Sequence, residues 1–334
     1  MRPGVAVAGV GAWGRNLARV FHRLGALRRL CDADESRLAD AAARHPGVST
    51  SRTIGEALAD RSVQAVAIAT PSATHARLAL EVVRAGKDVL VEKPLALTYA
   101  DGAAVVEEAG SRGAVLMVGH VLLYHPAVQR LKQLVSQGAL GEVHYLWSTR
   151  LNLGRVRREE NILWSFAPHD ISVMLLLFDR MPEAVGVFGG AYLQPEIADV
   201  TVSSYLFPGG AQAHIFVSWL HPFKEQRLVV VGSQKMAVFE DTATDKLRIY
   251  DKRITWVNGE PVPSERAEER IPLPTVEPLE AECAHFLDCV ARRTTPRTDG
   301  REGLRILRIL EASQQSLEQG RVVQIAGEEI ERNA

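Results

Sequence analysis

The sequence has few cysteines, few aromatic residues and no excess of charge of either sign. Only 3 of its 334 residues are cysteine, 6% are aromatic, and the formal net charge is −1. Cys31, Cys283 and Cys289 are too scattered for a zinc site or a disulfide framework, so we expect reduced, buried thiols and no bound metal. A nearly neutral chain has no general electrostatic attraction to nucleic acid or to membranes, and we expect neither as a partner.

Long apolar runs are also lacking. No stretch of about eighteen apolar residues occurs, so no transmembrane helix is expected. The first glycine turn is not preceded by a long apolar segment with a cleavage signal, and we therefore expect a cytoplasmic protein. A composition of 46% hydrophobic and 24% charged residues is that of a globular enzyme, and the length predicts two domains.

A glycine pattern organises the N-terminal region. Residues 5–8 form a short apolar run, three glycines with the spacing G-x-G-x-x-G follow, and apolar residues then recur at helical spacing. Strand, glycine turn and helix in this order predict a dinucleotide site, because the turn and the helix N-terminus can hold a pyrophosphate. An ordinary glycine-rich turn is the alternative. The candidate cofactor-binding residues of the turn are Gly9, Gly11, Ala12, Trp13 and Gly14.

An acidic residue follows the next predicted strand. Residues 27–31 read as that strand, and Asp32 comes directly after it, about twenty residues past the glycines. A carboxylate there binds the ribose hydroxyls and repels a 2′-phosphate, which favours NAD over NADP as the cofactor. Arg37 is a mild counter-signal, and Asp32 could instead cap the helix predicted over 34–44.

The order of predicted elements changes near residue 120. Before it, strands and helices alternate, which predicts an α/β domain with a doubly wound parallel sheet. After it, strands dominate, which predicts an α+β domain with a large, mostly antiparallel open sheet. We expect a nucleotide-binding Rossmann domain over 1–122 and a substrate-binding and oligomerisation domain over 123–334, with the helix over 300–319 packing back on the first. The expected strands are 5–8, 27–31, 63–69, 88–92, 115–118, 143–150, 184–188, 200–207, 211–219, 227–231, 236–241, 247–250 and 254–257.

Two motifs after strands of the first domain carry a family resemblance. Thr-Pro-Ser-Ala-Thr-His at residues 70–75, and residues 85–96 with the tripeptide Glu-Lys-Pro, resemble the signature of the glucose–fructose oxidoreductase, inositol dehydrogenase and MocA family. The resemblance spans nearly the whole chain. It implies an NAD-dependent oxidoreductase acting on a CH–OH group, and a homodimer or homotetramer formed through the C-terminal sheet. The candidate cofactor-binding residues in these motifs are Thr70, Pro71, Ser72, His75, Glu92 and Lys93, with Ser72 replacing the family's Asn.

The resemblance implies that Lys93 contacts nicotinamide and the substrate hydroxyl. An ammonium beside that hydroxyl oxygen stabilises the alkoxide that develops as hydride leaves. Pro94 restricts Lys93 to an extended backbone, which favours a fixed orientation over an ordinary surface lysine. Glu92 is expected to be a structural partner rather than a catalyst.

A second candidate catalytic residue lies in the segment 152–170. His169 matches the histidine that acts as base in an Asp-x-x-x-His pattern of the family, and Pro168 predicts a helix that starts close by. Ser165 stands where the family has the aspartate, and Asp170 would point about 100° away around the helix. The alternative is a helix-capping pair of His169 and Asp170.

The same segment begins with arginines at 155, 157 and 158. Guanidinium groups suit phosphates, whereas Glu159 and Glu160 could neutralise them in a solvated loop. The run from 158 to 170 resembles sugar-nucleotide 3-dehydrogenases that oxidise the C3 hydroxyl of UDP-N-acetylglucosamine ahead of an aminotransferase in amino-sugar and lipopolysaccharide biosynthesis. The candidate substrate-binding residues are Lys93, Tyr124, Arg155, Arg157, Asn161, Trp164 and His169.

We therefore expect a UDP-N-acetylglucosamine 3-dehydrogenase. The same-class alternatives are a UDP-N-acetylglucosaminuronate dehydrogenase, a free-sugar or inositol dehydrogenase, and a ketosugar reductase. A non-catalytic NAD-binding regulator is the alternative of another class, and the presence of both Lys93 and His169 argues against it.

The cofactor preference is testable by titration. NAD should bind more tightly than NADP, and Asp32→Ala should narrow the difference because the carboxylate no longer repels the 2′-phosphate. Tighter binding of NADP by the wild type would contradict the assignment.

Overall fold

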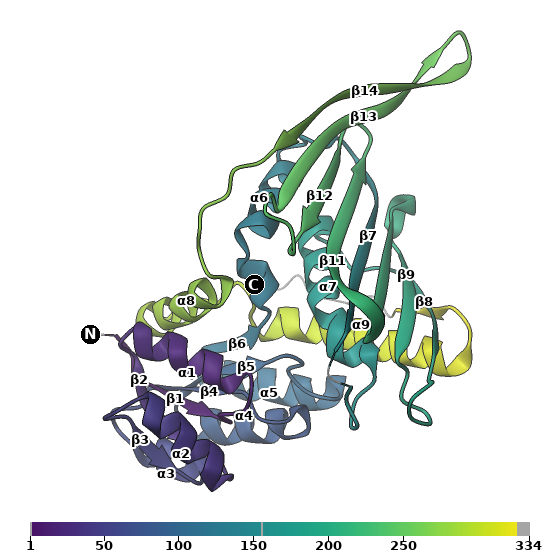
Figure 1. The fold of residues 1–334 in the computed structure, drawn as a ribbon. Coiled ribbons are helices and arrows are strands. Elements are labelled where there is room, and N and C mark those ends of the chain that lie inside the picture. Colours follow the sequence, from purple (N-terminus) through teal and green to yellow (C-terminus); the bar gives the residue numbers. More distant parts are fainter. Residues whose placement is uncertain (1, 155, 326–334) are drawn as a thin grey trace. The chain divides into compact units, whose positions relative to one another are not determined.

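The computed structural model describes residues 2–154 and 156–325, and its internal contacts divide the chain into two units (Figure 1). Of the described residues, the first unit contains those up to Tyr124 together with Val276–Leu307, and the second contains those between His125 and Thr275 and those from Arg308 to Ile325. Residues 276–307 therefore group with the first unit, whereas the sequence placed them in the second domain. The division falls inside the helix expected over 300–319.

The first unit is an alternation of strands and helices. Its strands are β1 Val5–Ala8, β2 Leu27–Cys31, β3 Ser49–Ser51, β4 Ala65–Ile68, β5 Asp88–Glu92 and β6 Leu116–Gly119. Its helices are α1 Gly14–Arg23, α2 Glu35–Arg44, α3 Ile54–Ala59, α4 His75–Arg84, α5 Tyr99–Ser111, α8 Pro278–Arg292 and the first part of α9 Gly300–Gln319.

The six strands form one parallel sheet in the order β3-β2-β1-β4-β5-β6. The order reverses between β1 and β4, which is the switch point where a doubly wound sheet binds nucleotides. The predicted Rossmann fold is confirmed. Strands β1, β4, β5 and β6 are buried along their whole length, as strands covered on both faces must be.

The turn between β1 and α1 leaves no room for two side chains. Gly9 has φ +87°, which suits glycine, and a Cβ there would lie 2.7 Å from the backbone of Ala69. A Cβ on Gly14 would collide with the carbonyl oxygen of Gly9, so helix and strand approach as closely as backbones allow. Around Gly11, by contrast, nothing lies within 4 Å of such a Cβ. Two of the glycines therefore serve the fold, and Gly11 leaves open the approach to the turn.

The second unit contains nine strands and three α-helical segments among the described residues. The helices are α6 Pro126–Ser136, α7 Ile162–Phe178 and the last part of α9. The strands are β7 Val143–Leu153, β8 Ala184–Gly190, β9 Val200–Leu206, β10 Gln212–Ser218, β11 Leu220–Gly232, β12 Met236–Glu240, β13 Leu247–Val257, β14 Glu260–Arg270 and β15 Val323–Gln324.

These strands form a single sheet in the order β14-β13-β12-β11-β7-β10-β9-β8-β15. All neighbours are antiparallel except β7 and β10, so the predicted mostly antiparallel sheet is confirmed. Helix α7 packs against β7, β9 and β10. Large side chains on other positions of these strands and of β8 are exposed, namely Tyr145, Trp147, Phe188, Val202 and Leu206.

The hairpin of β13 and β14 differs from the sequence prediction. Residues 247–250 and 254–257 were expected as two strands, but β13 is continuous, and β14 was not expected at all. Figure 1 shows the two strands as a long ribbon that projects beyond the rest of their sheet. The turn between the two strands is Asn258-Gly259, with φ +53° and +85°, as a two-residue hairpin turn requires.

No helix in the described ranges is long and apolar enough to cross a membrane.

The two glycines of the turn should respond differently to alanine. Gly14→Ala should lower the free energy of unfolding by about 1–3 kcal/mol or more, because the backbone it meets cannot move aside. Gly11→Ala should leave stability unchanged or about 0.4–1 kcal/mol higher, yet weaken NAD binding, because its methyl group would stand where the pyrophosphate approaches. Denaturant titration and NAD titration of both variants measure this, and unweakened NAD binding by Gly11→Ala would contradict it.

Candidate functional site

Asp32 lies against the glycine turn. Its carboxylate accepts a hydrogen bond from the backbone N–H of Val10 at 2.8 Å and another from that of Asp34 at 2.9 Å. The N-cap of α2 is Asp34, whose side chain accepts from the N–H groups of Ser36 and Arg37. The alternative of Asp32 as a helix cap is therefore wrong. Arg37 forms an ion pair with Asp34 at 3.2 Å, so its nearest carboxylate partner is Asp34 and not Asp32.

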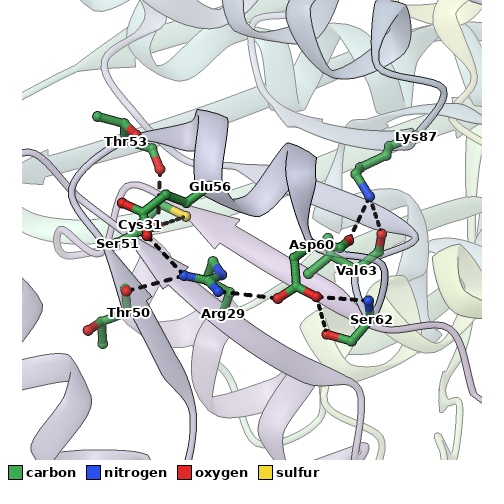
Figure 2. A network of polar contacts seen from close by, with 10 residues as sticks. All are labelled: Arg29, Cys31, Thr50, Ser51, Thr53, Glu56, Asp60, Ser62, Val63 and Lys87. Carbon is green, nitrogen blue, oxygen red and sulfur yellow. Dashed lines mark hydrogen bonds and ion pairs between the residues drawn. The ribbon is translucent and has the colours of Figure 1, made fainter.

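A polar network fixes the strand that leads to Asp32 (Figure 2). Arg29 on β2 reaches Glu56 at 3.4 Å, Asp60 at 3.3 Å and a backbone carbonyl of β3. Cys31 lies 3.1 Å from the hydroxyl of Ser51, and burial raises the pKa of its thiol. These contacts lie within the first unit, and they hold β2, β3 and the end of α3 together.

Thr53 and Glu56 have the spacing of a capping box at the start of α3. Thr53 is the N-cap residue, but its side chain makes no cap hydrogen bond. Its carbonyl oxygen instead accepts from the hydroxyl of Ser51 at 3.0 Å.

The loops after β4 and β5 are joined by His75. Its Nε2 lies 2.9 Å from the carbonyl oxygen of Thr70, and its Nδ1 lies 2.7 Å from that of Pro94. The ring is 2% exposed. The side chain expected at the cofactor therefore holds the two loops that carry Thr70 and Lys93, while Pro71 and Ser72 begin a short 3₁₀ turn between them.

Lys93 follows β5 and is partly exposed. The peptide bond between Lys93 and Pro94 is cis. The carboxyl of Glu92 accepts from the indole N–H of Trp13 and, at 3.3 Å, from the backbone N–H of Lys93. Burial raises the pKa of Glu92 to about 7. The first unit thus brings the glycine turn, Asp32 and the Glu-Lys-Pro motif to the carboxyl edge of one sheet.

Tyr124 has a packing role in the first unit. Its side chain is 4% exposed, its hydroxyl lies 3.3 Å from that of Thr298, and the guanidinium of Arg297 lies 4.9 Å from the centre of its ring. Burial raises the pKa of the Tyr124 hydroxyl. The sequence suggested Tyr124 as a substrate-binding residue, whereas these contacts are those of a side chain packed inside the first unit.

Helix α7 carries His169 in the second unit. It begins at Ile162, with Asn161 as the N-cap whose side chain accepts from the N–H of Trp164 at 3.2 Å. The prediction that the helix starts near Pro168 is wrong, because Pro168 lies inside it. His169 follows, partly exposed, near the middle of the helix.

The carboxylate of Asp170 binds residues of the sheet. Its carboxylate accepts from the hydroxyl of Ser148 at 2.7 Å and from the guanidinium of Arg150 at 2.8 and 3.2 Å. Both partners lie on β7, so Asp170 fastens the helix to the sheet. The predicted direction of Asp170 is confirmed, and the capping pair of His169 and Asp170 is excluded.

Two of the candidate substrate-binding residues share a partner. The amide of Asn161 donates to Gln314 at 2.8 Å, and the indole N–H of Trp164 donates to the same oxygen at 3.1 Å. Gln314 was not identified from the sequence, where it reads as an ordinary polar residue of an amphipathic helix. It fixes the first turn of α7.

The arginine segment is described only in part. Arg155 lies outside the described residues. Arg157 is half-exposed, its Nε lies 3.6 Å from Glu160, and its carbonyl oxygen accepts from Gln194 at 2.7 Å. Glu160 is thus close enough to neutralise Arg157 in part, as the alternative from the sequence expected. Among the described residues, no group of three His, Cys, Asp or Glu side chains is arranged to hold a metal ion.

Comparison with known proteins gives a consistent result. A model described as an oxidoreductase family with an NAD-binding Rossmann fold matches residues 4–120, and a GFO/IDH/MocA C-terminal domain model matches residues 128–238. The UDP-N-acetylglucosamine 3-dehydrogenase of Acidithiobacillus ferrooxidans is 29% identical over 308 residues, covering 92% of this chain and 94% of its own.

Solved structures agree over almost the full length. A structure of that dehydrogenase has a TM-score of 0.84 at 27% identity, covering 96% of this chain and 98% of its own. The crystal structure of GenD2 from gentamicin A biosynthesis, in complex with NAD, has a TM-score of 0.84 at 25% identity, covering 98% and 97%. With both domain models matched in order over most of its length, the chain belongs to the Gfo/Idh/MocA family and is an NAD-dependent oxidoreductase acting on CH–OH groups.

Proposed function

We propose that the protein oxidises the C3 hydroxyl of a UDP-sugar, UDP-N-acetylglucosamine to its 3-keto form, with NAD as the oxidant. The observation that carries this proposal is the similarity to a UDP-N-acetylglucosamine 3-dehydrogenase over 92% of this chain. The 3-keto product is the substrate that an aminotransferase would require in amino-sugar and lipopolysaccharide biosynthesis.

The first unit has the features that NAD requires. Gly11 leaves the turn open, the N-terminus of α1 follows it, and Asp32 presents a carboxylate to the same turn. Asp34 pairs with the nearby Arg37 and so partly offsets a positive charge that could attract a 2′-phosphate. NAD supplies the hydride acceptor when it is bound.

The chemical roles follow from the residue types. As the C3–H leaves as hydride, the hydroxyl loses its proton, and the charge that develops on its oxygen must be stabilised. We assign that stabilisation to the ammonium of Lys93 and the proton acceptance to the imidazole of His169. Each side chain is partly exposed, and each is carried on a segment that the surrounding structure fixes.

A free-sugar or inositol dehydrogenase is the second candidate. The observation that favours it is the contact of Arg157 with Glu160, because an arginine neutralised within its own loop is less available to a diphosphate. We propose Asn161 and Trp164 as substrate-binding residues under either candidate, and their bonds to Gln314 fix where the two side chains lie.

The exposed apolar side chains of the nine-stranded sheet support a homodimer or homotetramer formed through that face. We also place the enzyme in the cytoplasm. Its three cysteines are free and buried, which fits a reducing compartment.

Alanine variants test the two catalytic assignments. Lys93→Ala and His169→Ala should each leave NAD binding nearly intact and lower turnover about 10²–10⁴-fold, the usual contribution of such groups. NAD titration and initial rates measure both effects. Near-normal turnover of His169→Ala across the pH range would place the base elsewhere.

A substrate panel tests the UDP-sugar. Reduction of NAD should be seen with UDP-N-acetylglucosamine and be poor with N-acetylglucosamine or inositol, because binding energy from the remote diphosphate positions C3. Arg155→Ala and Arg157→Ala should raise KM for the UDP-sugar about tenfold or more, the value of a charged hydrogen bond. Raised salt should weaken wild-type binding more than binding by the variants.

Two controls make the panel decisive. Glu160→Gln should lower KM for the UDP-sugar, because it releases Arg157 from its neighbour. Arg52→Ala removes an exposed, ion-paired arginine of the first unit and should leave KM unchanged. Equal activity with the free sugar would favour the second candidate.

A further inference from the structure

The carboxyl group of Glu92 connects two parts of the first unit. One oxygen accepts from the indole of Trp13, which belongs to the glycine turn, and the other accepts from the backbone N–H of Lys93 at 3.3 Å. Glu92 is the last residue of β5 and is 8% exposed. A single buried side chain therefore holds both the turn that faces the cofactor and the residue proposed for chemistry.

The neighbouring strand makes room for this carboxyl. Gly119 ends β6 and pairs directly with Glu92 across the sheet. A Cβ on Gly119 would lie 2.9 Å from the carboxyl carbon and from each oxygen of Glu92. This is closer than real Cβ contacts come, so any other residue at 119 would push the carboxyl from its place.

A second carboxyl is buried nearby. Glu282 on α8 is 0% exposed, and neither of its oxygens has a hydrogen-bond partner among the described residues. Burial, and then the charge of Glu92, raise the pKa of Glu282 well above its usual value. A buried carboxylate without a donor is costly, so this group keeps its proton. His120, beside Lys93, is neutral as well, because burial lowers its pKa to about 3.

We propose that Glu92 is a positioning residue that joins the glycine turn to the backbone of Lys93, and that Glu282 limits the buried pair to one negative charge by holding a proton. The inference rests on the proposed catalytic role of Lys93. Glu92 acts on the reaction through Trp13 and Lys93.

The two buried carboxyls, Glu92 and Glu282, make the hydrogen bond between Trp13 and Glu92 depend on pH. Three groups near the carboxyl of Glu92 are titratable: Lys93 on its own strand end, and Glu282 and Cys283 from α8. Burial raises the pKa of Glu92 to about 7, so the group gains its charge as the pH rises through neutrality. The hydrogen bond from Trp13 is then charge-assisted and stronger. Because the folded state holds this proton and the unfolded state releases it above about pH 4.5, Glu92 lowers stability as the pH rises from about 4.5 to 7.

Tryptophan emission of the NAD-free protein reports the link directly. Titration from about pH 5 to 9 should show a step with a midpoint near 7, since the indole of Trp13 donates to the group that titrates. Glu92→Gln, which keeps an acceptor but cannot titrate, should abolish the step, and so should Trp13→Phe. Trp256→Phe removes an exposed indole on β13 and should retain it. A step that persists in Glu92→Gln, or that is absent from the wild type, overturns the proposal.

Glu282→Gln tests the shared proton. A neutral amide replaces a neutral acid, so the midpoint of the step should stay within about half a pH unit. A downward shift of about one unit or more would show that Glu282 is charged and would overturn its assigned role. The substitution should also raise the melting temperature more at pH 8 than at pH 5, because it removes a carboxyl that ionises only in the unfolded chain.

Kinetics separate positioning from a purely structural role. Glu92→Gln should lower kcat about 10–100-fold while KM for the sugar substrate stays unchanged. The amide has one acceptor oxygen where the carboxylate has two, so the N–H of Lys93 loses its partner and the ammonium is less well placed for the transition state. Trp13→Phe should weaken NAD binding, since the turn loses its tie to β5. Full kcat in Glu92→Gln would overturn the positioning role. The emission step and the NAD titration need no sugar, so they stay decisive even if the UDP-sugar proves to be the wrong substrate.

Discussion

The carboxyl ends of parallel strands lie at one edge of their sheet, and this constraint determines where the candidate site residues of the first unit lie. Every strand of the six-stranded sheet runs in the same direction, so its last residue passes directly into a loop at the carboxyl edge. Asp32, Thr70 and Lys93 follow three such ends, and Gly119 is a fourth. None of these residues is near another in sequence, yet their loops are joined by hydrogen bonds that the carboxylates of Asp32 and Glu92 accept and by those of the His75 ring.

Buried carboxyl groups in this protein differ in what surrounds them. Asp199, 0% exposed, accepts from two backbone N–H groups and from the indole of Trp219. Asp170 is paired with Arg150. Donors of this kind replace the water that a carboxylate loses on burial. Glu282 has no such donor among the described residues, and burial raises its pKa well above the usual value.

Much of the first unit could be predicted because its signals are local. The glycine spacing, Asp32 and the apolar strands are each readable within a few residues. The start of α7 was misplaced because Pro168, a common residue of a helix's first turn, here lies inside the helix, and the cap Asn161 was interpreted only as a substrate-binding residue. Strand β14 was missed because Pro261 and Pro263 argue against a strand, and only its place at the sheet edge admits them.

Other features depend on partners far along the chain. The roles of Gln314 and Arg150 follow from contacts with α7 that no local pattern encodes. Glu282 left a trace that could have been followed, because it falls at helical spacing on the same buried stripe as Leu279, Cys283 and Phe286. A charged residue in an apolar stripe is a signal of an unusual environment, although the stripe alone cannot name the neighbour.

The division of the first unit into two separate chain segments also affects how the protein is made. Phe21 on α1 packs edge-on against Phe286 on α8, and Arg19 and Arg23 pair with Glu277 at the approach to that helix. At about 5–20 residues per second, a ribosome that has completed the sixth strand needs roughly 8–30 seconds more before α8 is synthesised. During that interval the nascent sheet has its glycine turn but lacks the helix that covers Phe21. Until α8 is made, the incomplete first unit exposes apolar surface. The order of synthesis is therefore a constraint on this fold, and we expect chaperones to bind the nascent chain.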